Sequence, residues 1–255
     1  MYLGIDSGST STKLAVIDGS GQLLAHRVAE TGPDCGETAA RLWDELRVQA
    51  DLSPGAVKGT VATGYGRGRI AMADRRVTEI TCHAVGVHHL VPDALSIIDM
   101  GGQDSKVIRL DDSGRVEDFA MNDKCAAGTG RFLEVIARRF NMTVDQLGDV
   151  AASDAPPITI NSTCTVFAET EVVGLLAEGH AREAILAGVH MALARRVAAM
   201  FDQVGGRGPV AFSGGVALNP AMVRALGSCL KTPLAVAPHP QLTAALGAAL
   251  LAANR

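Results

Sequence analysis

The chain has 255 residues, of which 47% are apolar and 20% are charged, and its formal net charge is −4. This composition excludes a disordered chain, and without a long basic run we expect no nucleic-acid partner. The longest apolar stretches, such as Leu242–Ala253, are too short to span a bilayer, so we expect no membrane association. Because the sequence begins with a strand-like segment and not with a signal peptide, we expect a cytoplasmic protein.

Two segments of the chain repeat one pattern at an offset of 93 residues. Each begins with a short apolar strand that ends in aspartate, Asp6 in the first copy and Asp99 in the second. In both copies there follow a turn rich in small residues, a lysine (Lys13 or Lys106), a second apolar strand and a turn composed of Asp, Ser and Gly. A repeat at this offset indicates a duplicated unit.

The first turn of each copy has the composition of a phosphate-binding loop. Gly8 and Gly101 allow the backbone to bend sharply and to approach a ligand. Backbone N–H groups and hydroxyls in such a turn can hold phosphate, and Asp6 and Asp99 are placed to hold Mg²⁺ or its water shell. One copy alone is equally typical of an ordinary hairpin, but two copies with aspartate at the same place favour a nucleotide site.

Two of the five cysteines differ from the others in their surroundings. Cys125 and Cys164 lie among small polar residues, each shortly before a segment with the apolar spacing of an amphipathic helix. A helix N-terminus favours the thiolate, which is the form that binds metals. Two thiolates do not complete a four-cysteine iron–sulfur site, but a two-fold homodimer supplies four. We expect Cys35, Cys82 and Cys229 to be packing residues, with a reactive thiol as the alternative for Cys82, which lies beside His83.

The last third of the chain is predicted to form a helix, a strand with a glycine turn, and a closing helix. The apolar spacing over 191–205 predicts the first helix. The strand at 211–213 is followed by Gly214 and Gly215, which allow the backbone to pass close to a purine or ribose. The small side chains of 241–251 suit a helix that packs tightly against a neighbour.

Two phosphate-type turns followed by a strand with a Gly-Gly turn resemble the actin, sugar-kinase and heat-shock-chaperone superfamily. The resemblance implies an α/β fold of two duplicated ribonuclease-H-like (actin-like ATPase) domains, with nucleotide in the cleft between them. We expect an N-terminal half-domain over residues 1–93 and a C-terminal half-domain over 94–255 that carries the cluster cysteines. The last helix is expected to pack back on the N-terminal half.

Longer motifs resemble the activators of 2-hydroxyacyl-CoA dehydratases, which are BadF/BadG/BcrA/BcrD-type ATPases. The motifs are NDKCAAGTGRFLE at 122–134, STCTVFAE at 162–169, TGYGR at 63–67 and IDMGGQDSK at 98–106. The resemblance covers essentially the whole chain. It implies a homodimer that holds one 4Fe–4S cluster between its subunits and couples ATP hydrolysis to one-electron transfer. A ferredoxin- or flavodoxin-like donor and an iron–sulfur acceptor enzyme are the implied partners.

The resemblance also implies roles for individual residues. Cys125 and Cys164 are the cluster ligands, and Asp6 and Asp104 act with Mg²⁺ to position water and phosphate. Arg67 contacts a phosphate or the partner, or is an ordinary surface arginine, and Glu134 bonds the ribose or is an ordinary surface charge. The residues expected to contact ATP or ADP are Gly8, Ser9, Thr10, Thr12, Lys13, Gly101, Gly102, Gln103, Gly128, Gly130, Glu134, Gly214, Gly215, Asn219 and Gln241.

Other functions stay open from the sequence. Activators of double-cubane cluster proteins and ATPase subunits of benzoyl-CoA reductase share this scaffold, so the acceptor enzyme is not fixed. A small-molecule kinase of the same fold explains the phosphate turns but not the cysteine motifs. A nucleotide-sensing scaffold without catalysis explains the turns equally well and predicts negligible ATP turnover.

Overall fold

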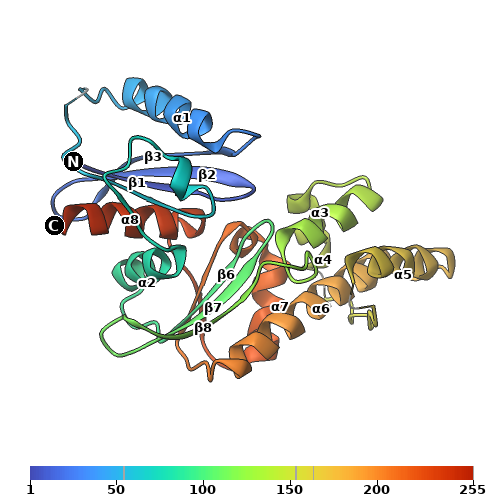
Figure 1. Cartoon of the computed structure of the whole chain (residues 1–255). Coiled ribbons are helices and arrows are strands. Elements are labelled where there is room, and N and C mark those ends of the chain that lie inside the picture. The colour runs from blue at the N-terminus through green and yellow to red at the C-terminus, as the bar shows by residue number, and fades with distance from the viewer. Residues whose placement is uncertain (54, 153, 163, 255) are drawn as a thin grey trace. The chain divides into compact units, whose positions relative to one another are not determined.

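The computed structural model describes residues 1–53, 55–152, 154–162 and 164–254. The chain divides into two compact units, each with a five-stranded mixed sheet and helices (Figure 1). The first unit comprises Met1–Ala94, Leu110–Glu117 and Ala237–Arg255, and the second comprises Leu95–Arg109 and Asp118–Val236. Both units have the α/β architecture that the sequence predicts.

The sheet of the first unit has the strand order β3-β2-β1-β4-β5. β1 pairs antiparallel with β2 and parallel with β4, so a hairpin and a crossover strand flank it. Helix α1 (Cys35–Gln49) begins where the Asp34 side chain accepts hydrogen bonds from two backbone N–H groups, and it buries Leu42 and Leu46 against the sheet. The strands are β1 (Tyr2–Ser7), β2 (Ser11–Ile17), β3 (Leu23–Glu30), β4 (Thr60–Thr63) and β5 (Arg75–Arg76).

Helices α2 (Glu79–Leu90) and α8 (Thr243–Ala253) pack tightly together in the first unit (Figure 1). A Cβ atom on Gly247 would lie 1.8 Å from the carbonyl oxygen of Cys82, so the two helix backbones touch there. A Cβ atom on Gly4 of β1 would lie equally close, 1.8 Å, to the carbonyl of Ala245. The small residues of the closing helix therefore allow the contact that their pattern predicts, and the helix belongs to the first unit.

The sheet of the second unit has the order β10-β9-β6-β7-β8 and repeats the arrangement of the first. β6 pairs antiparallel with β7 and parallel with β9. The central strand β6 thus has the same two kinds of neighbour as β1. The strands are β6 (Ser96–Met100), β7 (Ser105–Leu110), β8 (Val116–Asn122), β9 (Val210–Ser213) and β10 (Leu234–Val236).

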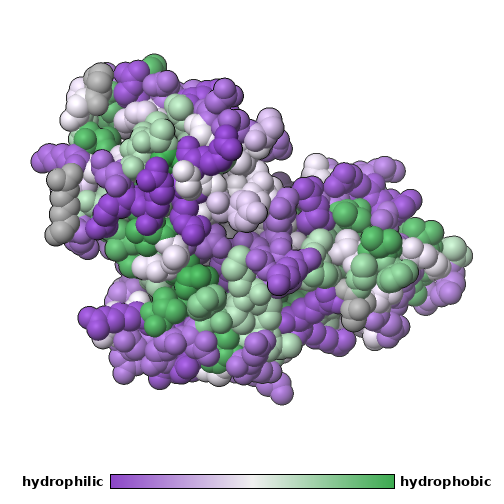
Figure 2. Space-filling view, viewed as in Figure 1, coloured by the Kyte–Doolittle hydropathy of each residue, from purple (hydrophilic) through white to green (hydrophobic). Residues whose placement is uncertain are grey.

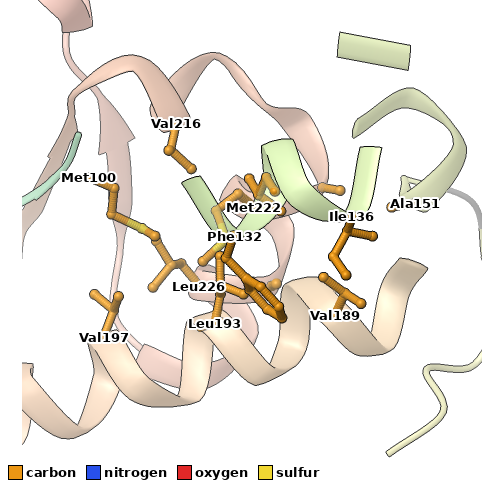
Figure 3. Close-up of a cluster of buried hydrophobic side chains, with 14 of the residues drawn as sticks. Met100, Phe132, Ile136, Ala151, Val189, Leu193, Val197, Val216, Met222 and Leu226 are labelled. Atoms are coloured by element: carbon orange, nitrogen blue, oxygen red, sulfur yellow. The ribbon is translucent and has the colours of Figure 1, made fainter. Parts of the chain in front are cut away.

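Helices form a core with this second sheet. Phe132 and Ile136 of one helix meet Val189 and Leu193 of another, with Leu226 packed beside them (Figure 3). All five side chains are buried, so this cluster fixes the helices that follow the cysteine motifs. The helices are α3 (Gly130–Arg139), α4 (Val144–Ala151), α5 (Thr165–Ala177), α6 (Arg182–Gln203) and α7 (Pro220–Leu230), and the short 3₁₀ helices of the chain are η1 (Arg67–Arg69), η2 (Gly215–Leu218) and η3 (Pro240–Leu242).

Helix α6 begins at Arg182, nine residues before the predicted start at Met191, and ends near the predicted end. Among the described helices it alone is long and apolar enough to cross a membrane by length and composition. Half of its most apolar window is buried inside the protein. Its buried residues, such as Val197, belong to the core of the second unit, so the apolar composition of α6 is that of a core helix.

Candidate functional site

The two predicted phosphate hairpins carry the same cross-strand ion pair. In the first, Asp6 lies opposite Lys13, and the lysine Nζ is 3.0 Å from an aspartate oxygen. In the second, Asp99 lies opposite Lys106 at 3.5 Å, and Lys106 also contacts Asp104 at 2.8 Å. The repeat in sequence is therefore a repeat of charge pairs at the ends of two central strands.

The hairpin tips are also closed in the same way. The backbone N–H of Gly8 donates to the carbonyl of Ser11 at 3.1 Å, and that of Gly101 donates to the carbonyl of Asp104 at 2.9 Å. This shared bond turns each loop back over the end of its aspartate-bearing strand.

The parallel neighbour of each aspartate-bearing strand ends in a hydroxyl residue. Thr63 of β4 is in register with Asp6, and Ser213 of β9 is in register with Asp99. The Ser213 hydroxyl donates to Asp99 at 2.9 Å. Asp99 is buried and contacts both Lys106 and this hydroxyl, so its carboxylate stabilises the second hairpin.

Each of these parallel strands is followed by a glycine with positive φ, Gly64 at +84° and Gly214 at +87°. A Cβ atom on Gly64 would lie 2.6 Å from the carbonyl oxygen of Ser7, and one on Gly214 would lie 2.3 Å from that of Met100. Ser7 and Met100 are themselves equivalent in the repeat. The match between the two turns is not evident in the sequence, because the segments that separate them from their aspartates differ greatly in length.

Four hydroxyls in and beside the first hairpin fall into two groups. Thr12 is buried and shares a hydrogen bond of 3.0 Å with Thr31, whose hydroxyl donates to the carbonyl of Gly8. The hydroxyl oxygens of Ser7 and Thr10 are buried and have no hydrogen-bond partner among the described residues. A buried hydroxyl without a partner costs about 1–3 kcal/mol, so these two fit a site that a polar ligand completes. Ser7 was not predicted as a site residue, and its position after a strand-ending aspartate could have indicated it.

The second hairpin is bonded directly to the start of α3. The backbone N–H of Gly130 donates to the carbonyl of Gly101 at 2.9 Å, and that of Arg131 donates to Gly102 at 2.7 Å. A Cβ atom on Gly130 would lie 3.1 Å from the Gly101 oxygen, so a larger residue would push the two segments apart. The hairpin and the helix therefore form one connected piece of backbone.

The loop that carries Cys125 is held by side-chain hydrogen bonds. The Asn122 amide donates to the carbonyl of Cys125 at 2.8 Å, and the Ser105 hydroxyl of β7 donates to the carbonyl of Gly128. Cys125 itself is exposed, beside a cavity of about 230 Å³ that Gln103 and Arg131 also line. Helix α3 begins only at Gly130, so Cys125 precedes the helix by a short loop.

Cys164 lies at the N-cap of α5 and is exposed. Val166 and Phe167 beside it are 67% and 68% exposed, and Figure 2 shows hydrophobic residues on the surface over α5. By contrast, burial raises the pKa of the Cys82 thiol to about 12, which excludes it as a thiolate near neutral pH. Burial also raises the pKa of Cys229, whose sulfur contacts Met191.

A four-thiolate cluster fits these residues only if a second chain takes part. Among the described residues, no group of three or more His, Cys, Asp or Glu side chains is placed to hold a metal ion. Cys125 and Cys164 are two exposed thiols in the same unit, and the exposed apolar side chains of Val166 and Phe167 beside Cys164 suit coverage by another chain. The donor chemistry fits an iron–sulfur cluster shared between two copies.

Other predicted site residues have defined partners. Glu134 forms an ion pair with Arg131 at 2.7 Å. The Asn219 side chain accepts from the backbone N–H of Met222 and so caps α7. Gln241 lies in η3 and belongs to the first unit with the first hairpin. The second hairpin, the two exposed cysteines and the Gly-Gly turn belong to the second unit.

A model of the BadF/BadG/BcrA/BcrD ATPase family matches residues 3–252. The chain belongs to this family. The activator of lactoyl-CoA dehydratase from Anaerotignum propionicum is 47% identical to this ATPase over 255 residues, which are 99% of this chain and 97% of that protein. The family resemblance predicted from the phosphate and cysteine motifs is thereby confirmed.

Solved structures confirm the predicted fold class. The activator of 2-hydroxyisocaproyl-CoA dehydratase from Clostridium difficile, solved with bound ADPNP, is 41% identical and matches with a TM-score of 0.93 over 100% of this chain and 95% of that chain. A ROK-family glucokinase from Streptomyces griseus matches with a TM-score of 0.64 at 12% identity, over 100% of this chain and 99% of that chain, and so shares the fold alone. The ATPase therefore has the fold of nucleotide-dependent kinases and activators.

Proposed function

We propose that this ATPase is an activator that couples ATP hydrolysis to the delivery of one electron to an iron–sulfur enzyme of the 2-hydroxyacyl-CoA dehydratase class. The observation that carries the proposal is the bonding of Gly101 and Gly102 to the first residues of α3, Gly130 and Arg131. Because Cys125 lies shortly before α3, a phosphate held by the second hairpin acts on the segment that carries a cluster ligand.

In the first unit we assign the phosphates and Mg²⁺ of ATP or ADP to the first hairpin. Asp6 is a nearly buried carboxylate at a strand end, which suits a magnesium ion that keeps most of its water shell. Lys13 beside it offsets phosphate charge. Phosphate oxygens or metal-bound water would supply the partners that the hydroxyls of Ser7 and Thr10 lack among the described residues.

In the second unit we assign further phosphate contacts to Gly101–Asp104 and the nucleoside to the Gly214–Gly215 turn. Asp104 is the more exposed of the two carboxylates beside Lys106, with 24% of its side chain accessible, against 5% for Asp99. Asp104 is therefore the residue placed to orient the attacking water, and Asp99 maintains the hairpin.

We assign Cys125 and Cys164 of two copies as the ligands of one 4Fe–4S cluster in a homodimer. When bound, the cluster supplies a low-potential carrier of one electron, which a ferredoxin- or flavodoxin-like protein loads. The chain holds both thiolates at exposed positions and provides Val166 and Phe167 to exclude water around them. We place this activity in the cytoplasm, where thiols stay reduced.

The position of Cys164 gives the chain a means to change the electrostatics of the site. A helix N-terminus stabilises nearby negative charge by about 0.3–2 kcal/mol. For one electron this corresponds to roughly 10–90 mV. A shift of the N-terminus of α5 relative to the thiolates removes part of that stabilisation, and the modest size means that a change in docking or exposure must contribute as well.

Anaerobic reconstitution with iron and sulfide tests the assignment. The wild-type dimer is expected to bind about four iron ions. Cys125→Ser and Cys164→Ser are expected to lose the iron–sulfur absorbance and to keep ATP binding, while Cys229→Ser, a change at a packing cysteine, keeps both. A full cluster in either of the first two variants contradicts the ligand assignment. Activation of lactoyl-CoA dehydratase by the wild type, only in the presence of ATP, tests the function itself.

A further inference from the structure

The duplicated architecture contains two equivalent glycine turns, and only the turn of the second unit has been assigned a function. In the second unit, Gly214 opens the turn proposed to border the nucleoside. The equivalent turn of the first unit follows β4, and we call its residues 64–69 the Tyr65 loop. Its first residue, Gly64, has the φ of Gly214 to within a few degrees, +84° against +87°. The two turns therefore share one backbone conformation, but the turn of the first unit carries a tyrosine and arginines.

The Tyr65 loop is attached to the first phosphate hairpin. The backbone N–H of Gly66 donates to the carbonyl of Ser7 at 2.8 Å. A Cβ atom on Gly64 would lie 2.5 Å from a carboxylate oxygen of Asp6, and one on Gly66 would lie 2.5 Å from the Ser7 hydroxyl. Both glycines are thus required by contact with the residues assigned to Mg²⁺ and phosphate, and a shift of that hairpin moves the loop with it.

The loop displays its aromatic residue on a fixed backbone. The side chain of Tyr65 is 88% exposed, although the two glycines beside it are held against the hairpin. The Arg67 guanidinium donates to the carbonyl of Gly64 at 2.9 Å, and that of Arg76 donates to the carbonyl of Arg67 at 3.1 Å. These bonds brace the loop across its width, so Tyr65 is presented with little freedom of the main chain.

The surroundings of Tyr65 are basic in a chain that is acidic as a whole. Residues 65–76 contain four arginines and one acid, a net charge of +3, whereas the chain carries −4. The acid, Asp74, accepts from the backbone N–H of Thr60. The Arg69 side chain is 71% exposed, and its guanidinium pairs with the Asp34 carboxylate at 3.4 Å while staying open to solvent. The loop therefore offers an exposed ring beside exposed positive charge.

We propose that the Tyr65 loop is the surface on which a carboxylate-bearing face of the acceptor enzyme docks, and that its position follows the nucleotide state of the first hairpin. The proposal rests on the proposed activator function. Tyr and Arg are the residues most enriched among those that dominate protein interfaces. A small molecule needs a concave site that buries most of its surface, and a ring that is 88% exposed provides none.

The acceptor enzyme suits this loop better than a second copy of the chain. The residues assigned to the shared cluster belong to the second unit, whereas the whole Tyr65 loop belongs to the first. Attachment to Asp6 and Ser7 gives ATP a direct influence on an encounter that ATP is proposed to drive.

Titration of the reconstituted holoenzyme with lactoyl-CoA dehydratase, in the presence of ATP, tests this. Tyr65→Ala is expected to raise the dehydratase concentration at half-maximal activation about tenfold, and Arg69→Gln about threefold with a weaker dependence on salt. Tyr65→Phe keeps the ring and is expected to stay near the wild type. Arg41→Gln on α1 removes an exposed arginine elsewhere in the first unit and serves as the charge-matched control.

All four variants are expected to keep the iron content, the dimer and the ATP hydrolysis rate without dehydratase within about twofold of the wild type. If the wild type activates the dehydratase and Tyr65→Ala does so at the same dehydratase concentration, the docking site is contradicted but the proposed function is not. A monomeric Tyr65→Ala protein also contradicts the docking site, because the loop then holds two copies together. If the wild type itself fails to activate the dehydratase, the proposed function fails and the docking site with it.

Discussion

The Nε2 atom of His190 lies 3.1 Å from the amide nitrogen of Asn219, and this contact fixes the chemical state of both side chains. The other ring nitrogen of His190 lies 2.8 Å from the carbonyl oxygen of Leu186, which can only accept. The proton therefore sits on Nδ1, Nε2 accepts from the Asn219 amide, and burial lowers the pKa of His190 so that the ring is neutral. The Asn219 oxygen is left to cap α7 at Met222.

Asn219→Asp is expected to reverse the pH dependence of this site. In the wild type the pKa of His190 is lower in the folded state than its unfolded value of about 6.5, so its contribution to stability is full above that value and is lost as pH falls. An aspartate keeps the cap but cannot donate to Nε2, and its charge raises the histidine pKa. The variant should then be more stable at pH 6 than at pH 8. Urea unfolding at both pH values measures the free energy of unfolding. If the wild type and the variant both lose stability to the same extent from pH 8 to pH 6, the assigned tautomer is contradicted.

Ser105→Ala is expected to weaken the link between the second hairpin and the cysteine loop. The hydroxyl of Ser105 is buried and donates to the carbonyl of Gly128, so its loss costs about 1 kcal/mol of stability. The rate of electron delivery to the dehydratase should fall more than the rate of ATP hydrolysis, so that fewer electrons are delivered per ATP. Ser113→Ala, at an exposed turn, is the control and should change neither. Equal losses of delivery and hydrolysis would show that the bond supports only the fold.

Asp6→Asn and Asp99→Asn are expected to fail in different ways. Asp6 is assigned to Mg²⁺, so Asp6→Asn should lower ATP turnover about 100-fold or more. Asp99 contacts Lys106 and Ser213 and is buried, so Asp99→Asn should lower the free energy of unfolding, by about 3 kcal/mol, because it leaves a buried lysine short of a partner. Turnover assays and urea titrations separate the two effects. Equal turnover losses without destabilisation would place both carboxylates at the nucleotide.

Gly214→Ala is expected to destabilise the second unit by about 2 kcal/mol or more, because a Cβ atom there would lie 2.3 Å from the Met100 oxygen at a φ of +87°. Gly227 on α7 has no atom within 4 Å of the corresponding position. Gly227→Ala should therefore be neutral or slightly stabilising, as alanine usually is in a helix. A thermal melt of both variants compares them directly.

The sequence allowed the two hairpins to be predicted because aspartate, glycine and lysine recur with the same spacing in both copies, and the spacing within a hairpin is set by local structure. The placement of Cys164 at a helix start followed equally from local pattern. The turn at Gly64 escaped detection as the equivalent of Gly214, because its match depends on parallel pairing between strands far apart in the chain. The capping role of Asn219 could have been inferred, since Asn followed by Pro is a common helix start.

The membership of the closing helix in the first unit illustrates a further limit. Its small residues predict a close contact with a neighbour, whereas the expectation that this neighbour is the N-terminal half rests on the resemblance to the actin-like fold. The contact with α2 is decided by glycines on both helices, Gly86 and Gly247, which lie far apart in the sequence. Local propensity carries no information about such pairs.

We propose that ATP acts through the second hairpin and the cysteine loop to release an electron to a partner enzyme. The most direct test of this coupling mixes the anaerobically reduced dimer with lactoyl-CoA dehydratase in a stopped-flow instrument and follows the iron–sulfur absorbance. With ATP present, we expect rapid reoxidation of the dimer together with the appearance of dehydratase activity, and neither event without ATP. Reoxidation at the same rate with and without ATP would contradict this coupling.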